Sequence, residues 1–219
     1  MHIFVWHVAA NRIRHDEGMD FKQWKGMPMS ENGQKNVILI TDGDDVAAQA
    51  IQQVAADIGG RCISRSSGNP THLTGEELVE QILRAKGDPV LVMFDDNGHM
   101  GLGEGERALR YVARHPRIRV LGAIAVASNT GMVRGTHIDL SIDARGQVVT
   151  TGVDKYGNKN PFKEKRVYGD TVDVLGQLNI PLIIGIGDIG KMQGRDDIHL
   201  GAPITLKAVN MILERSGLR

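Results

Sequence analysis

The chain has 219 residues, a length typical of one domain with a single substantial core. Its 26 lysines and arginines balance 26 aspartates and glutamates, so no net charge favours nucleic acid or an anionic membrane. A single cysteine, Cys62, excludes an internal disulfide, and no apolar run approaches the ~20 residues of a membrane-spanning helix.

Residues 1–35 differ in composition from the rest of the chain. Both tryptophans lie in this segment, and residues 25–35 are rich in Gly, Pro, Ser and Asn, which favours a linker. We therefore expect residues 1–35 to form a flexible N-terminal extension and residues 36–219 to form a single α/β domain.

From residue 36 onward, β-rich runs alternate with helical patterns. Strands are predicted at residues 37–40, 61–64, 90–94, 120–127 and 181–186. In the helical segments, apolar residues recur at helical spacing, and Thr74 with Glu77 makes a capping box. A turn at residues 143–146 between two alternating segments predicts a β-hairpin. This alternation predicts a three-layer, doubly wound α/β fold whose mostly parallel five-stranded sheet, Rossmann-like or flavodoxin-like in order, carries a β-hairpin insertion.

Polar residues follow the predicted strands where ligands bind in sheets of this kind, beyond the carboxyl ends. The candidate ligand-binding rim consists of Asp42, Asp44, Asp95, Asp96, Ser128, Asn129, Asp188 and Lys191. Carboxylate oxygens are the ligands that Mg²⁺ and Ca²⁺ prefer, so the rim predicts a metal site. Its expected ligands are Asp42, Asp44, Asp95 and Asp188. The alternative is that these residues form turns and cap helices, which is the ordinary role of Asp after a strand.

The order of polar residues also coarsely resembles the receiver domain of bacterial response regulators. That domain carries acids after its first strand, a phosphoacceptor Asp after its third, and Ser or Thr and Lys after its fourth and fifth. The analogous residues here are Asp44, Asp45, Asp95, Ser128 and Lys191. A magnesium-dependent phosphoryl-transfer or phosphoacceptor domain is therefore one hypothesis. The glycine-rich segment 101–105 matches neither the Rossmann nor the Walker spacing. Segment 185–191 is closer to a nucleotide-binding loop, but no Ser or Thr follows Lys191.

A series of blocks from residue 36 to about residue 217 resembles the stage V sporulation protein AE family, of the SpoVAEa type. The blocks are VILITDGD at 37–44, GGRCIS at 59–64, SGNPT at 67–71, DPVLVMFDD at 88–96, GAIAVASNT at 122–130, VDKYG at 153–157, GDTV at 169–172 and GIGDIGKM at 185–192. The resemblance implies a soluble, non-enzymatic subunit of the SpoVA system, which moves dipicolinic acid, with calcium, into the developing spore and releases it during germination.

The resemblance also implies a location and partners. We expect a cytoplasmic protein, peripheral to the inner spore membrane and without a transmembrane segment. Its expected partners are other SpoVA proteins, a SpoVAF-type membrane protein and germinant receptors, and not nucleic acid. No catalytic residue is implied, and no cofactor is expected beyond a Mg²⁺ or Ca²⁺ ion at the acidic rim.

Overall fold

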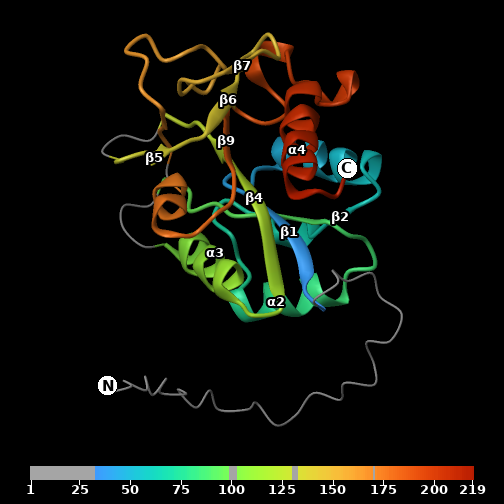
Figure 1. Cartoon of the computed structure of the whole chain (residues 1–219). Coiled ribbons are helices and arrows are strands. Elements are labelled where there is room, and N and C mark those ends of the chain that lie inside the picture. The colour runs from blue at the N-terminus through green and yellow to red at the C-terminus, as the bar shows by residue number, and fades with distance from the viewer. Residues whose placement is uncertain (1–32, 99–102, 130–132, 170) are drawn as a thin grey trace, which may run out of the picture.

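The computed structural model describes residues 33–98, 103–129, 133–169 and 171–219 (Figure 1). The extension expected at residues 1–35 lies almost wholly outside these ranges. The first strand begins at Lys35, one residue before the boundary suggested by the sequence, and Lys35 already pairs with Ile118. The folded body therefore includes the end of the segment that composition marked as a linker.

Seven strands form one sheet in the order β2-β3-β1-β4-β9-β6-β7. They are β1 (Lys35–Ile40), β2 (Arg61–Cys62), β3 (Val90–Met93), β4 (Ile118–Val126), β6 (Leu140–Ile142), β7 (Val148–Val149) and β9 (Ile183–Ile186). Every neighbouring pair is parallel except β6 with β7, which is antiparallel. The predicted α/β class and mostly parallel sheet are therefore confirmed.

The number and order of the strands differ from the sequence-based expectation. The five predicted parallel strands are β1, β2, β3, β4 and β9. Along the sheet they lie in the order β2-β3-β1-β4-β9, which is neither the Rossmann nor the flavodoxin order. The hairpin forms as predicted, but β6 also pairs in parallel with β9, so the hairpin extends the sheet. Such pairings join residues far apart in sequence, and local patterns do not encode them.

A second, two-stranded sheet joins β5 (Thr136–His137) to β8 (Arg166–Val167) in antiparallel pairing. Sequence analysis did not anticipate it, because each strand has only two residues and the intervening segment 138–165 contains the hairpin and a polar loop. This small sheet lies beside the hairpin at one side of the molecule (Figure 1).

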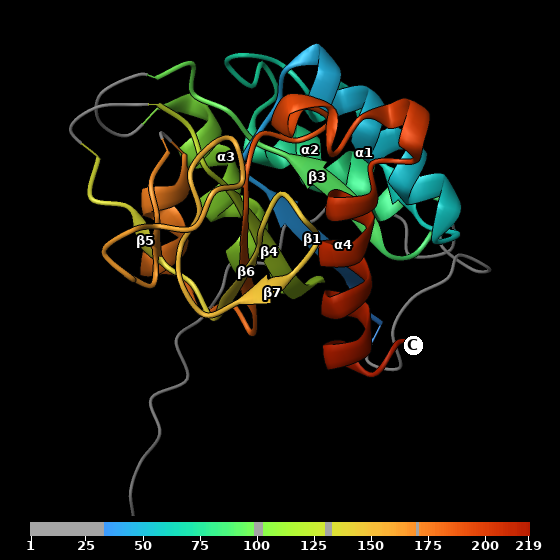
Figure 2. The ribbon, with the colours of Figure 1, turned by 90° about the horizontal axis from the view of Figure 1, so that it is seen from above.

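Helices cover both faces of the large sheet (Figure 2). One face packs against α1 (Asp45–Asp57) and α4 (Pro203–Ser216), and the other against α2 (Gly75–Arg84), α3 (Glu104–Arg114) and the 3₁₀ helix η3 (Val172–Gln177). Shorter 3₁₀ helices are η2 (Ser64–Ser66), η4 (Met192–Gly194) and η5 (Ile198–Leu200). In β1, Ile38 and Ile40 face one layer and Val37 and Leu39 the other, which explains why residues 37–40 of this strand are all apolar.

The predicted capping box is confirmed. Thr74 and Glu77 make the reciprocal bonds of a capping box at the start of α2. Gly217 caps α4 with a positive φ of 78°. Cys62 is buried in β2, and burial raises the pKa of its thiol to about 12, so this thiol remains protonated. Within the described ranges, no helix is long and apolar enough to cross a membrane.

The acidic crevice at the carboxyl ends of the strands

The strand topology opens a crevice at the carboxyl edge of the sheet. The chain leaves β1 for α1 on one face and leaves neighbouring β3 for α3 on the other, so the connections diverge. A cavity of about 320 Å³ lies there and is called the acidic crevice. Its charged lining comes from Asp42 and Asp44 after β1, Asp95 after β3 and Asp188 after β9. The structure thus brings together the four carboxylates predicted as metal ligands.

The remaining predicted rim residues fall into different positions. Ser128 lines the crevice after β4, whereas Asn129 is exposed and is not part of the lining. The Asp96 carboxylate accepts hydrogen bonds from the backbone N–H groups of Gly105 (2.7 Å) and Glu106 (2.8 Å). Asp96 therefore anchors the first turn of α3, which is the capping role that the sequence left open as the alternative.

Asp42 is the most constrained acid of the crevice. It is 9% exposed, and its Oδ1 accepts a hydrogen bond from the Gly43 N–H at 2.8 Å. Its Oδ2 is buried and has no hydrogen-bond partner in the described part of the chain. Burial, followed by the negative charges of Asp44 and Asp188, raises the pKa of Asp42 to about 8, against the opposing charge of Lys191.

Lys191 joins two of the crevice acids. Its ammonium donates hydrogen bonds to Asp44 and, at 3.0 Å, to Asp188. Burial would lower the pKa of Lys191, but the bonds and charges of these two carboxylates raise it. Burial likewise opposes ionisation of Asp44, yet the Ala47 N–H at 2.9 Å and Lys191 lower its pKa overall. Asp44 is therefore both the N-cap of α1 and a partner of Lys191.

Hydrogen bonds to Thr71 and Asn97 fix the position of Asp95. Its N–H donates to Thr71 Oγ1 and its carbonyl accepts from the Thr71 N–H, and its Oδ1 accepts from the Asn97 N–H at 2.9 Å. Gly43 stands against it, since a Cβ at position 43 would lie 2.9 Å from Asp95 Cβ and 2.7 Å from the Gly68 carbonyl oxygen. Glycine at 43 is what allows the β1 and β3 ends to approach so closely.

The four carboxylates do not form a compact cage. Among the described residues, no three His, Cys, Asp or Glu side chains gather at separations that could hold a metal ion. Lys191 joins Asp44 and Asp188, whereas the Oδ1 atoms of Asp42 and Asp95 accept backbone hydrogen bonds from Gly43 and Asn97. Of the receiver-like positions, Asp44, Asp95 and Ser128 line the crevice, Lys191 borders it, and Asp45 is exposed on α1.

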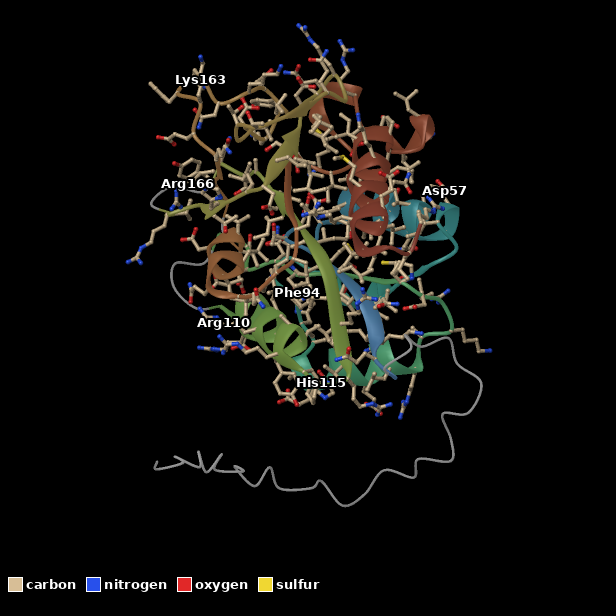
Figure 3. All side chains as sticks on the ribbon, in the orientation of Figure 1. Asp57, Phe94, Arg110, His115, Lys163 and Arg166 are labelled. Carbon is tan, nitrogen blue, oxygen red and sulfur yellow. The ribbon has the colours of Figure 1, made fainter. Side chains whose placement is uncertain are left out.

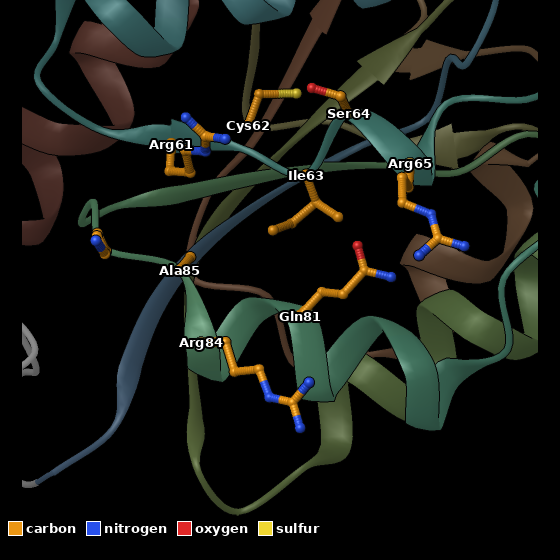
Figure 4. A pocket seen from close by; sticks show the side chains of 9 residues that line it. Arg61, Cys62, Ile63, Ser64, Arg65, Gln81, Arg84 and Ala85 are labelled. Carbon is orange, nitrogen blue, oxygen red and sulfur yellow. The ribbon is translucent and has the colours of Figure 1, made fainter. Parts of the chain in front are cut away.

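A second recess, of about 490 Å³, was not anticipated from the sequence and lies beside β2, η2 and the end of α2. It is basic, with Arg61, Arg65, Arg84 and Lys86 in its lining. Figure 4 shows the three guanidinium groups spread around the recess rather than converging on one point. Arg84 is also paired with Glu80. This arrangement offers no focused anion site.

Asp196 is a site-positioning residue that sequence analysis missed. Its carboxylate is fully buried and accepts hydrogen bonds from the Gly190 N–H, the Thr205 hydroxyl and the N–H groups of Ile204 and Thr205. These bonds tie the loop that carries Asp188 and Lys191 to the first turn of α4. No local pattern could have identified it, because its partners lie six to nine residues away on both sides.

Comparison with known families gives a match over most of the chain. The model of the family SpoVAE, described as stage V sporulation protein AE1, matches residues 36–216. This range includes every residue of the acidic crevice and Asp196. No curated protein and no solved structure matches the chain.

Proposed function

Because the chain belongs to the stage V sporulation protein AE1 family and is thus a sporulation protein of the SpoVA system, we propose that it is a non-enzymatic subunit that supports dipicolinic acid movement and spore germination. It works through contact with membrane proteins, from a position peripheral to the inner spore membrane on the cytoplasmic side. Other SpoVA proteins, a SpoVAF-type membrane protein and germinant receptors are its partners. The match over residues 36–216 carries this proposal.

A polar loop supports the proposed contact with partners. The lysine loop, residues 155–165, contains Lys155, Lys159, Lys163 and Lys165. It also presents Phe162, which is 82% exposed, and the half-exposed Tyr156. Lys163 lies at the periphery of the molecule in Figure 3, well away from the core. Aromatic side chains within a polar surround are typical of protein interfaces, so we assign the partner contact to this loop.

Deletion and complementation in a spore former test the proposal. We expect deletion of the gene to slow both germination and dipicolinic acid release, and the unaltered gene to restore them. Phe162→Ser should fail to restore them and should weaken co-purification with the SpoVAF-type protein. Leu200→Ser, which alters an apolar residue that is 65% exposed on η5, is the matched control and should restore both. Unchanged germination and release after deletion would contradict the proposal.

A phosphoacceptor domain is the second candidate, favoured by the position of Asp95 and Ser128 in one crevice. In this reaction a carboxylate oxygen of Asp95 attacks the phosphorus of acetyl phosphate, and acetate leaves. Incubation with acetyl phosphate and Mg²⁺ should then add the mass of one phosphoryl group to the protein and none to Asp95→Asn. An unchanged mass for the unaltered protein removes this candidate.

A further inference from the structure

The acidic crevice contains a buried oxygen for which the fold provides no partner. Asp42 lines the cavity and is only 9% exposed. Its Oδ2 atom is buried and accepts no hydrogen bond within the described ranges. Buried carboxylate oxygens are normally hydrogen-bonded, paired or bound to a metal. We propose that the acidic crevice binds one hydrated Mg²⁺ ion, with Asp42 Oδ2 and the Asp95 carboxylate as its protein ligands.

Charge in the crevice supports a cation rather than another ligand. Four carboxylates line the cavity, and the bordering ammonium of Lys191 bonds to Asp44 and Asp188. No Lys, Arg or His of the described residues forms an ion pair with Asp42. A divalent cation would supply the missing positive charge.

The geometry points to Mg²⁺ rather than Ca²⁺. Calcium takes six to eight oxygen ligands, whereas magnesium keeps several waters and needs only one or two protein carboxylates. No group of three or more acidic, His or Cys side chains converges in the described parts of the chain, but Asp42 and Asp95 share the crevice. A cavity of about 320 Å³ has room for an ion and its waters.

The protein preorganises both proposed ligands. Asp42 is fixed by the Gly43 N–H, and Asp95 by Thr71 and the Asn97 N–H. Ser128, Asn69 and Asn97 also line the crevice and offer polar groups that can bond to metal-bound waters. Lys191 holds Asp44 and Asp188 together and offsets half of their negative charge, so the ion meets two fixed carboxylates beside a partly neutralised pair. This inference goes beyond the proposed function and does not depend on it.

Thermal unfolding of the full chain, stripped of metal with EDTA and then dialysed, tests the site. We expect 10 mM MgCl₂ to raise the Tm by roughly 3–10 °C, as a dissociation constant of about 0.1–1 mM implies. NaCl at the same ionic strength controls for screening of the crevice acids. A shift that NaCl reproduces, or no shift with Mg²⁺, overturns the proposal.

Variants locate the ion. Asp42→Asn and Asp95→Asn should each abolish at least nine-tenths of the Mg²⁺-specific shift. Asp45→Asn removes an equal charge from an exposed residue at the same end of β1 and should keep the shift. Because either crevice variant could lower stability, Mn²⁺ binding is also counted by electron paramagnetic resonance on the folded proteins. One bound Mn²⁺ in the unaltered chain and in Asp45→Asn, but none in Asp42→Asn, is expected. Equal binding by all of them contradicts the assignment.

Discussion

Two buried aspartates of this protein have opposite surroundings. Asp196 is 0% exposed, and each of its oxygens accepts two hydrogen bonds: Oδ1 from the N–H groups of Ile204 and Thr205, and Oδ2 from the Gly190 N–H and the Thr205 hydroxyl. Asp42 is almost as buried, but only its Oδ1 has a partner. The hydrogen bonds to Asp196 offset the cost of removing its carboxylate from water, so this residue stabilises the fold. The Asp42 carboxylate lacks such compensation at Oδ2, and a bound cation would supply it.

Loss of the Asp196 carboxylate should have the largest effect on stability. Asp196→Ala leaves three backbone N–H groups and the Thr205 hydroxyl without this acceptor, and we expect the free energy of unfolding to fall by about 4–6 kcal/mol. Urea unfolding followed by circular dichroism measures the change. Asp197→Ala, which removes one exposed hydrogen bond to the His199 N–H, should cost no more than about 1 kcal/mol. Equal losses of unfolding free energy for both variants would contradict the stabilising role of the buried Asp196 carboxylate.

The pH dependence of stability should reveal the cost of ionising the buried Asp42 carboxyl group. Its pKa in the folded protein, about 8, is above the unfolded value of about 3.8, so folding takes up a proton between these pH values. The contribution of Asp42 to stability is therefore full below about pH 4 and declines as the pH rises toward 8. We expect a decline of about 4 kcal/mol between pH 4 and 7 in EDTA, absent from Asp42→Asn.

Urea titrations at each pH provide the measurement, with Asp45→Asn as the control because its exposed carboxylate should leave the decline unchanged. Parallel pH curves for Asp42→Asn and the unaltered protein would mean that Asp42 ionises normally in the folded state.

Removal of the Lys191 ammonium should have a smaller effect, because the side chain and its two partners are each about one-third exposed. Lys191→Met is expected to lower the free energy of unfolding by about 1–2 kcal/mol at pH 7. Because Lys191 lowers the pKa of Asp44, the difference is present above about pH 4 and shrinks as acid protonates the carboxylate. Chemical unfolding at pH 7 and pH 3 measures it, and an equal difference at both values would contradict an ionic role.

Phe162→Ser should change stability least. The side chain is 82% exposed, so the free energy of unfolding should stay within about 0.5 kcal/mol of the unaltered value. Its effect should appear only in partner binding and germination. A thermal scan that places Phe162→Ser several degrees below the unaltered protein would mean that Phe162 packs against the body and is no contact residue.

Local patterns were sufficient to predict most regular elements. The period of the apolar residues and the Thr74–Glu77 capping box mark helices that the structure contains, and the apolar run at residues 37–40 is a buried strand. Strand order was not predictable in this way, because the pairing of β6 with β9 joins residues about 44 apart, such as Leu140 and Ile184. Sequence patterns report which face of an element is buried but not which element covers it.

The candidate site was predicted in outline but not in its details. Carboxyl ends of parallel strands share one edge of a sheet, so Asp42, Asp95 and Asp188 were expected to meet, and all three line the crevice. The neighbours Asp95 and Asp96 could not be told apart in sequence. Asp96 binds backbone N–H groups nine and ten residues away, and only folding reveals that separation of roles.

The contrast between the two buried aspartates is tested most directly by anomalous diffraction from a crystal of the unaltered protein soaked in Mn²⁺, which takes the place of Mg²⁺. The account predicts one strong peak in the acidic crevice, within about 2.0–2.3 Å of Asp42 Oδ2 and of an Asp95 oxygen, and no peak at Asp196. An empty crevice in well-ordered density, or a peak that contacts neither Asp42 nor Asp95, would contradict it.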